Sequence, residues 1–490
     1  MGQLDAANPQ IVMKLLAIAL VAAALPGHGH VGSPDVFYEG NAGPYRLLIT
    51  IRPPQVVPGV AEIEIRSASP DVRQIRIVPL RLGFKGAQFA PVPDTAQRSH
   101  EDPQFYTGAL WLMASGSWQV RVDVDGAQGQ GRISVPVPAL ATRVAGMQTA
   151  IAAVLLPLAL VLCLGLVSIA GAAVRDAMLD PGKQPDPARV RRSRIVMLVT
   201  ALLVGLALWF GNSWWGSEAG LYSRIIFKPL QLQATVEDGN HLVLQLEDPG
   251  WLNRRTDDLL PDHNHLMHLY VIHVPAMDLV WHLHPEQGGD ARFEQRLPAM
   301  PAGRYALYGD VVHANGLAET ATGEIEMPQI AGVPLLGDDA AGAGPPVTKA
   351  DYTATASPLA HGFRMVWERG EGKLRARQPY EFRFRLEDGQ GKPADGVELY
   401  MGMLGHAAFV SADRTVFAHV HPSGSAPMPA IELAQTENPH AGHMMTMQSG
   451  LPAEASFPYG FPKPGAYRIF VQMKRAGEIA TGVFDAEVVP

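Results

Sequence analysis

Histidine is concentrated in two short stretches of this 490-residue chain. Of its 17 histidines, six lie within residues 263–284 and five within 406–443. Each stretch contains an H-x-H-P motif, at 282–285 and at 419–422. Because side chains alternate along a β-strand, both imidazoles of such a motif point to the same face. Converging imidazole nitrogens are ligands for Cu(II), Zn(II) or Ni(II), so the spacing predicts metal binding.

A third histidine is expected to join each pair. Turns at 275–277 and 412–413 would fold each stretch into a hairpin. The second turn sets His406 directly across from His419, and the first sets His268 across from its own H-x-H pair. Opposed residues have Cβ atoms about 4.5–5.5 Å apart. The predicted metal sites are therefore one triad per hairpin: His268, His282 and His284 in the first, and His406, His419 and His421 in the second.

Sulfur ligands near the second triad favour copper over zinc. Methionines surround this stretch, and a thioether is a soft ligand that suits Cu(I). The segment 440–447 (HAGHMMTM) mixes both ligand types in a Pro- and Gly-flanked insert that could collect or hand over an ion. Zinc is the less favoured alternative. The predicted accessory ligands are Met403, His440, His443, Met444 and Met445.

Neighbouring residues are weaker candidates. His263 and His265 fall in the loop before the first strand, and His273 has an odd offset that puts it on the other face. Asp310 and His313 lie on a later strand and have no histidine counterpart in the second stretch. A single H-x-H on a strand is usually a solvated face. Its repetition, each time with a third histidine, favours metal ligation here.

The amino-terminal segment has the pattern of an export signal. Residues 13–25 (MKLLAIALVAAAL) combine one lysine, an apolar core and small residues, which predicts a signal peptide over 1–29, with Met13 as an alternative start. Cleavage after Gly29 would leave His30 first in the mature chain, where its amine and imidazole together could bind copper. Cleavage after Ala24 would instead leave a short histidine-containing tail.

Two apolar stretches, 147–174 and 195–215, contain no charged residue. Each is long enough to cross a hydrocarbon core of about 30 Å. The segment between them, 175–194, carries six basic and three acidic residues, so the positive-inside rule predicts a cytoplasmic loop. Both flanks then lie outside. The expected location is a bacterial inner membrane, with two passes through the lipid bilayer and both large regions in the periplasm.

The rest of the chain has the pattern of short strands. Runs such as 45–51 (YRLLITI) and 118–124 (WQVRVDV) alternate or are apolar and β-branched, between Pro and Gly clusters. The predicted fold class is mainly β: three small exported β-sandwich modules of Ig- or cupredoxin-like type, plus two transmembrane helices. The modules are expected at 30–140, 217–328 and 351–490, and 329–350, rich in Gly, Ala, Pro and Asp, is expected to be a linker.

The last two modules have the pattern of an internal duplication. Each contains a strand, a turn, a strand, the H-x-H-P motif, a variable insert, a segment with Pro, Gly and Tyr, and a final hairpin. We refer to residues 217–328 as repeat 1 and to residues 351–490 as repeat 2.

Composition excludes several classes of protein. One cysteine, Cys163, excludes an internal disulfide framework, a cysteine-type zinc site and a C-x-x-C redox pair. A net charge of −8 and a pI of about 6.1 give no case for a nucleic-acid partner. No nucleophile–base set, Gly-rich phosphate loop or carboxylate-paired metal motif is evident, so no catalytic residue is predicted.

The segment 30–65 (HVGSPDVFYEGNAGPYRLLITIRPPQVVPGVAEIEI) resembles the start of uncharacterised bacterial exported proteins with YtkA-like or FixH-like β domains. The H-x-H-P modules look like those of predicted metal-associated membrane proteins in the same group. Copper-handling domains of the CopC type are similar in principle, but their ligand order does not match, and no ligand is carried over. The FixH likeness implies a role in the assembly of a cation pump or a copper-dependent oxidase.

These observations favour a membrane-anchored periplasmic protein that binds copper, as Cu(I) or Cu(II), for buffering, tolerance or delivery. A copper-dependent membrane enzyme or a metal transporter is the expected partner. Two alternatives stay open. One is an assembly or scaffold factor whose histidines are incidental. The other is a copper oxidoreductase, in which a three-histidine site with an open position does redox chemistry.

Overall fold

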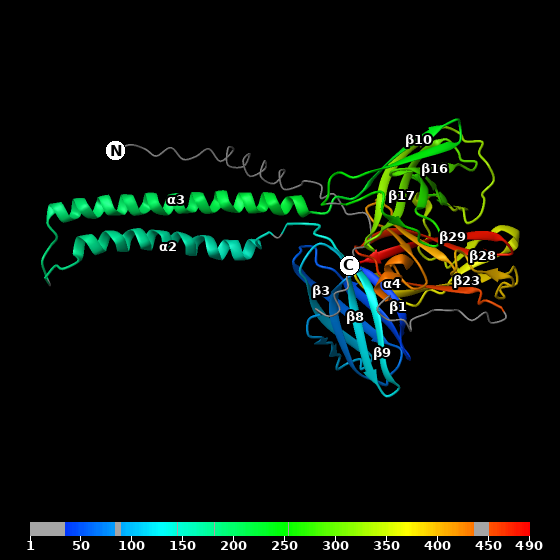
Figure 1. Ribbon diagram of the computed structural model, residues 1–490, viewed down its shortest axis with the longest axis horizontal. Coiled ribbons are helices and arrows are strands. Elements are labelled where there is room, and N and C mark those ends of the chain that lie inside the picture. The colour runs from blue at the N-terminus through cyan, green and yellow to red at the C-terminus, as the bar shows by residue number, and fades with distance from the viewer. Residues whose placement is uncertain (1–34, 84–89, 145, 181, 253, 436–449) are drawn as a thin grey trace.

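The computed structural model describes residues 35–490 except 84–89, 145, 181, 253 and 436–449. Three β-sandwiches gather at one end of a pair of long helices (Figure 1). The predicted fold class is confirmed: the described chain is mainly β and has two helices long and apolar enough to cross a membrane.

The amino-terminal module packs two antiparallel sheets, in the orders β1-β2-β3-β7-β6 and β5-β4-β8-β9. Alternate residues of the predicted strand 45–51, such as Leu47 and Ile49, are fully buried between the sheets. The strands are β1 Val36–Ala42, β2 Tyr45–Arg52, β3 Gly59–Ser67, β4 Val72–Arg81, β5 Asp94–Thr95, β6 Gln97–Arg98, β7 Phe105–Leu112, β8 Gly116–Gly126 and β9 Gly129–Ala139.

Repeat 1 follows the strand order β15-β16-β11-β10-β18-β17-β13-β14, with β12 on β17, and β19, from the segment 329–350, extends this sheet beyond β14. A single parallel pair, Gln231 with Thr322, joins the two halves of this sheet around one apolar core. The strands are β10 Gln231–Glu237, β11 His241–Glu247, β12 Leu259–Leu260, β13 His268–Val274, β14 Leu279–Leu283, β15 Glu286–Gly289, β16 Arg292–Arg296, β17 Gly303–His313, β18 Ala318–Met327 and β19 Ala340–Ala343.

Repeat 2 has two sheets, β20-β21-β23-β27 and β22-β29-β28-β25-β26, with β24 on β28. The order β18-β17-β13-β14 of repeat 1 recurs as β29-β28-β25-β26, as a duplication requires. The elements are η2 Val347–Lys349, β20 Ala356–Pro358, η3 Ala360–Gly362, β21 Arg364–Trp367, β22 Leu374–Arg375, β23 Tyr380–Glu387, β24 Val397–Glu398, β25 His406–Ser411, β26 Phe417–Val420, α4 Met428–Gln435, β27 Glu454–Tyr459, β28 Gly465–Arg475 and β29 Glu478–Val489.

The two repeats pack through equivalent sheet faces. Alternate residues of β13, such as Leu269 and Val271, point into the core of repeat 1, whereas Tyr270 and Ile272 point away from it. The outward side chains form a shared apolar cluster with Ala408, Val410, Phe417 and Phe470 of repeat 2. Phe417 stacks on Tyr308, with ring centroids 4.4 Å apart. Strands β13 and β25 are therefore buried on both faces, which explains their nearly continuous apolar sequences.

The helices differ in length from the sequence expectation. α2 covers Thr149–Asp176, and α3 covers Pro187–Ile225, 39 residues. Half of the predicted loop 175–194 is therefore helical, and residues 177–186 connect the two helices. Helix α3 starts early because Pro187 fits a first helical position and the Asp186 carboxylate accepts a hydrogen bond from the Arg189 amide at 2.7 Å. The Ser193 hydroxyl donates to the Gly171 carbonyl of α2 at 2.7 Å and fixes the helix pair.

The expected linker 329–350 is partly structured, which corrects the sequence prediction. Residues 340–343 form β19, which pairs with β14 at the edge of repeat 1. Small residues are needed there because a Cβ on Gly342 would lie 2.5 Å from the Thr481 methyl carbon of repeat 2. The Gly- and Ala-rich composition therefore serves close packing between the repeats rather than flexibility.

Arg468 fastens the interface between the repeats. Its fully buried guanidinium pairs with Asp485 at 2.9 Å and donates to the Met277 and Pro345 carbonyls at 2.8 and 2.7 Å. Arg468→Met leaves a buried carboxylate and two carbonyls without this donor. We expect it to lower the free energy of unfolding by about 3–5 kcal/mol, measured by chemical denaturation of the full chain in detergent.

The matched control is Arg414→Met. Arg414 also bridges the repeats, through an ion pair with Glu324, but that pair is partly exposed. A change of less than about 1 kcal/mol is expected. Equal effects of the two substitutions would contradict the conclusion that the buried Arg468 stabilises the contact between the repeats more than Arg414 does.

Candidate metal centre

Eight histidines gather where the packed faces of the two repeats end. They come from the loop before β13, from the first residues of β13 and β25, and from the ends of β14 and β26 with the residues that follow. The six histidines on or directly after these strands lie on the interface face because they continue the alternation of the apolar contact. The members are His263, His265, His268, His282, His284, His406, His419 and His421, which we call the histidine cluster.

The two predicted triads form one cluster, which differs from the expectation of two separate sites. The ring centroids of His268 and His419, from different repeats, lie 5.2 Å apart. Those of His282 and His419 lie 5.4 Å apart. The sequence could give each hairpin but not the packing of one hairpin against the other, which rests on the apolar faces of both repeats.

The hairpin pairing also corrects one prediction. In the first hairpin Leu269 lies opposite Leu283, so His268 aligns with His284 of its own H-x-H pair, as expected. His419 lies opposite Ala408, because the second strand pair is shifted by two residues from the expected register. His406 is therefore not directly across from His419. The two rings still meet diagonally, with His406 Nδ1 3.1 Å from His419 Nε2. Leu283 and Val420 point into the two cores, as predicted.

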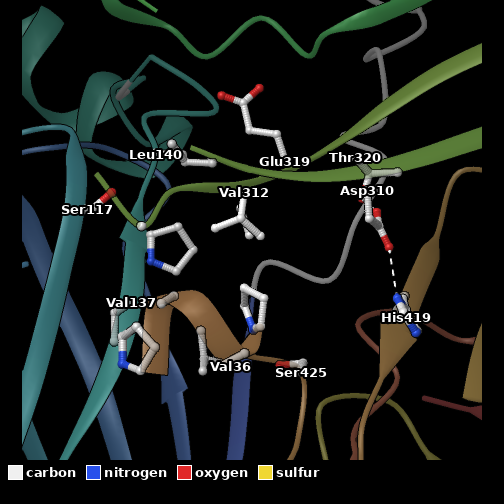
Figure 2. A pocket seen from close by; sticks show the side chains of 18 of the residues that line it. Val36, Ser117, Val137, Leu140, Asp310, Val312, Glu319, Thr320, His419 and Ser425 are labelled. Atoms are coloured by element: carbon white, nitrogen blue, oxygen red, sulfur yellow. Dashed lines mark hydrogen bonds and ion pairs between the residues drawn. The ribbon is translucent and has the colours of Figure 1, made fainter. Parts of the chain in front are cut away.

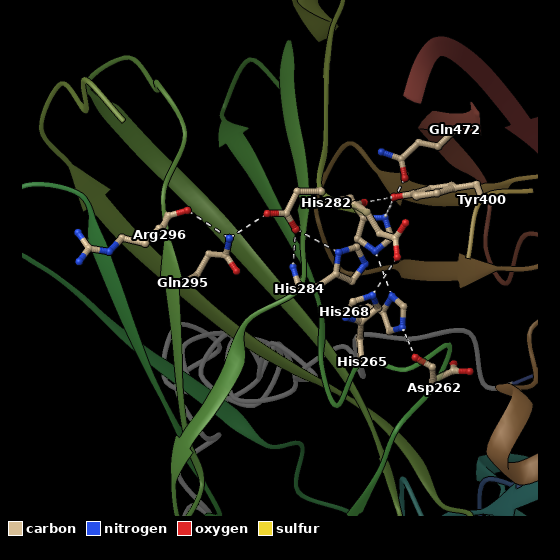
Figure 3. Close-up of polar contacts among 11 residues, drawn as sticks. Asp262, His265, His268, His282, His284, Gln295, Arg296, Tyr400 and Gln472 are labelled. Atoms are coloured by element: carbon tan, nitrogen blue, oxygen red, sulfur yellow. Dashed lines mark hydrogen bonds and ion pairs between the residues drawn. The ribbon is translucent and has the colours of Figure 1, made fainter. Parts of the chain in front are cut away.

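Two imidazole nitrogens face each other with unshared electron pairs. His268 Nε2 lies 3.0 Å from the Asp262 carbonyl, an acceptor, so this nitrogen carries the proton. His282 Nδ1 lies 2.8 Å from Gln472 Oε1 and 3.3 Å from the Tyr400 hydroxyl, which itself donates to the Asp338 carbonyl (Figure 3). His282 Nδ1 therefore also carries its proton. The remaining nitrogens, His268 Nδ1 and His282 Nε2, are 3.2 Å apart.

This separation suits two ligands of one ion. Two nitrogens at about 2.0–2.1 Å from a tetrahedral ion lie about 3.3–3.4 Å apart. A cation between them would satisfy both electron pairs. Further ring nitrogens in the cluster are buried without a hydrogen-bond partner: His263 Nε2, His284 Nε2 and His406 Nε2. The donor set therefore fits a metal ion with imidazole ligands.

Burial keeps these imidazoles neutral. Desolvation, followed by the mutual repulsion of neighbouring rings, lowers the pKa of His263 to about 4 and that of His268 to about 3. The same causes lower the pKa of the other buried rings well below the usual range: His282, His284, His406, His419 and His421. Neutral imidazole is the form that binds a metal.

Carboxylates orient the outer nitrogens of the cluster. Asp339 Oδ1 lies 3.1 Å from His284 Nδ1, and Asp310 Oδ2 lies 3.4 Å from His419 Nδ1. Burial raises the pKa of Asp339 to about 6 and that of Asp310 to about 7, and the Thr320 hydroxyl bonded to Asp310 acts in the opposite direction. A carboxylate behind an imidazole is a common outer shell of metal-binding histidines.

The remaining predicted residues fall outside the histidine cluster. Met403 is half-buried in the turn 400–403, three residues before the start of β25. His273 lies on the other face of β13, as predicted, and pairs with Asp278 at 2.7 Å. His313 pairs with Asp258 at 2.9 Å. The other predicted ligands lie outside the described residues: His30, His440, His443, Met444 and Met445.

Sequence reasoning underrated the residues 262–265. His263 packs on His421 of repeat 2 with centroids 5.0 Å apart, and His265 packs on His284 with centroids 4.0 Å apart. Asp262 Oδ1 lies 3.6 Å from His263 Nε2. A signal was present, because His263 and His265 form a further H-x-H. This segment lacks a strand pattern, however, so alternation could not place its side chains.

Comparison with known proteins gives a family match for repeat 2. Residues 360–489 match a family model described as a domain of unknown function (DUF8832). No curated protein gives a significant match to the chain.

Three solved structures are similar at low scores. An engineered protein has a TM-score of 0.15 at 12% identity, over 19% of this chain and 20% of that chain. Fibronectin(III)-like modules of CbhA from Clostridium thermocellum have a TM-score of 0.20 at 10% identity, over 57% and 94%. Trypsin-activated α2-macroglobulin from Escherichia coli has a TM-score of 0.16 at 9% identity, over 95% and 24%. Likenesses at these scores carry no argument about function.

We expect acid to destabilise the metal-free protein partly through His268. An unfolded histidine titrates near pH 6.5, whereas the folded pKa of His268 is about 3. Between these values the unfolded chain binds a proton that the folded protein excludes, so the contribution of His268 is complete above pH 6.5 and is lost as the pH falls toward 3. His268→Gln should reduce the slope of unfolding free energy by about 1 kcal/mol per pH unit, measured by denaturation between pH 7 and pH 5.

His361→Gln is the control for this slope. The His361 side chain is 73% exposed on repeat 2 and lies outside the histidine cluster. Its removal should leave the slope unchanged. Identical slopes for His268→Gln and the parent protein would contradict the buried, neutral state of His268.

Proposed function

We propose that this protein is a membrane-anchored copper-binding protein of the bacterial periplasm, with its metal centre between the two repeats. One observation carries the proposal: the unshared electron pairs of His268 Nδ1 and His282 Nε2 face each other at 3.2 Å in a buried site. Two neutral imidazoles in this arrangement repel each other unless a cation lies between them. His419 supplies a third nitrogen within 4.8 Å of both.

The choice of copper rests on the donor set. The ligand atoms of the cluster are imidazole nitrogens, and copper heads the order of divalent-metal affinities for such ligands. The only thiol, Cys163, lies within α2, away from the sandwiches. A centre without thiols suits an oxidising compartment, where copper would oxidise cysteine. This compartment agrees with the export signal and the basic segment between the helices, which favour two membrane passes with the sandwiches outside the cytoplasm.

The proposed work is copper buffering, tolerance or delivery to a copper-dependent membrane enzyme or a metal transporter. A buried centre without exposed ligand positions favours retention of the ion. The relative exposure is 2% for His268 and 0% for His282, and the His419 side chain is 5% exposed. A partner would have to draw the ion out through a path that the protein itself provides.

Metal titration of the full chain in detergent tests this proposal. Purified metal-free protein would be titrated with Cu(II), Cu(I) and Zn(II), and bound metal counted after gel filtration. We expect tight copper binding that exceeds zinc binding. Replacing two ligands from different repeats, His282→Gln with His419→Gln, should weaken copper binding by at least about 100-fold, since even a residue behind a ligand contributes 10–100-fold.

The control variant is again His361→Gln, which should bind copper as the parent protein does. The thermal unfolding temperature should rise on copper addition in the parent and in the control but not in the double variant, because a ligand that binds only the folded state stabilises it. Weak copper binding that is unchanged by the double substitution would contradict the proposed metal function. An assembly factor with incidental histidines would then be the better explanation.

A further inference from the structure

Three groups of ligand atoms in the histidine cluster share members. Each group has its atoms within 4.8 Å of one another. His419 belongs to the first and second groups, and His421 belongs to the second and third. The groups are His268 with His282 and His419; His406 with His419 and His421; and Asp262 with His263 and His421.

Shared ligands decide which groups can be filled together. An ion at the middle group would draw on residues of both end groups, because His419 and His421 are shared. The first and third groups have no residue in common, and both can be filled at once. Between these two groups, the ring centroids of His419 and His421 lie 4.6 Å apart, and those of His263 and His268 lie 6.3 Å apart.

Both end groups border one cavity of about 180 Å³ between the three sandwiches. Asp262 and His421 of the third group line it, and so do His268 and His419 of the first group. His282 of the first group is fully buried and is not among the residues that line this cavity. Figure 2 shows this cavity ringed by Val36, Val137, Leu140 and Val312, with Asp310 and His419 at its edge.

We propose that the protein holds two metal ions at once. The inner ion lies among His268, His282 and His419, and the outer ion lies among Asp262, His263 and His421. This inference rests on the proposed metal function and adds to it the number of ions. Both groups border the cavity, and only the outer group includes a carboxylate oxygen. No bond to carbon or change of oxidation state is involved.

The experiment counts Cu(II) ions on the full chain in detergent. The parent protein should bind two per chain, and two neighbouring Cu(II) ions should show dipolar coupling in the electron paramagnetic resonance spectrum. His282→Gln should retain only the outer ion, and His263→Gln only the inner ion. Each single variant should show an uncoupled spectrum, and the two spectra should differ because only the outer group includes a carboxylate.

His361→Gln is the control, because His361 is 73% exposed and lies outside the histidine cluster. This variant should keep both ions and their coupling. A parent protein with one ion per chain, or the loss of all copper in both His282→Gln and His263→Gln with His361→Gln intact, would overturn the two-ion centre while leaving the proposed function standing. A parent protein with no copper would overturn the proposed function itself.

Discussion

The candidate metal centre depends on one contact, the 3.2 Å separation of His268 Nδ1 and His282 Nε2. The Asp262 carbonyl behind one ring and Gln472 behind the other fix the tautomers. Gln472 belongs to repeat 2, whereas both rings belong to repeat 1, so the chemistry of the pair depends on the contact between the repeats. That contact is secured by Arg468 and by the stacked rings of Tyr308 and Phe417.

A duplication explains how one such contact supplies so many ligands. The strands β13 and β14 of repeat 1 correspond to β25 and β26 of repeat 2, and each strand pair carries histidines at equivalent positions. When equivalent faces pack together, equivalent side chains meet at the same end of the interface. The two repeats are not symmetric in detail. His263 and His265 have no counterparts in repeat 2, and the third ligand group therefore forms on one side only.

Much of this could be predicted from the sequence. Strand alternation placed His282 with His284, and His419 with His421, on one face of each hairpin. The two apolar helices and the short strands could be predicted from composition and from the alternation of apolar residues. The duplication could be predicted from the repeated order of motifs. The register of the first hairpin was also as expected, since Leu269 lies opposite Leu283. The register of the second hairpin was not, because a shift of two residues depends on the turn and on the opposing sheet. The merging of two triads into one cluster depends on a sheet-to-sheet contact whose apolar residues look like ordinary core residues in sequence. The Gly-rich segment around Gly342 looked like a linker because close packing and flexibility both call for small residues.

The position of the cavity connects the centre to the helices. Phe227, two residues after the end of α3, lines the cavity, and so do Leu140 and Thr142, shortly before the start of α2. Both connections to the helix pair therefore form part of its wall, together with the amino-terminal module. His268 and His419 of the inner group line the cavity together with Asp262 and His421 of the outer group. Under the proposed function, an ion released from either group would therefore enter a cavity whose wall includes the connections to the two apolar helices.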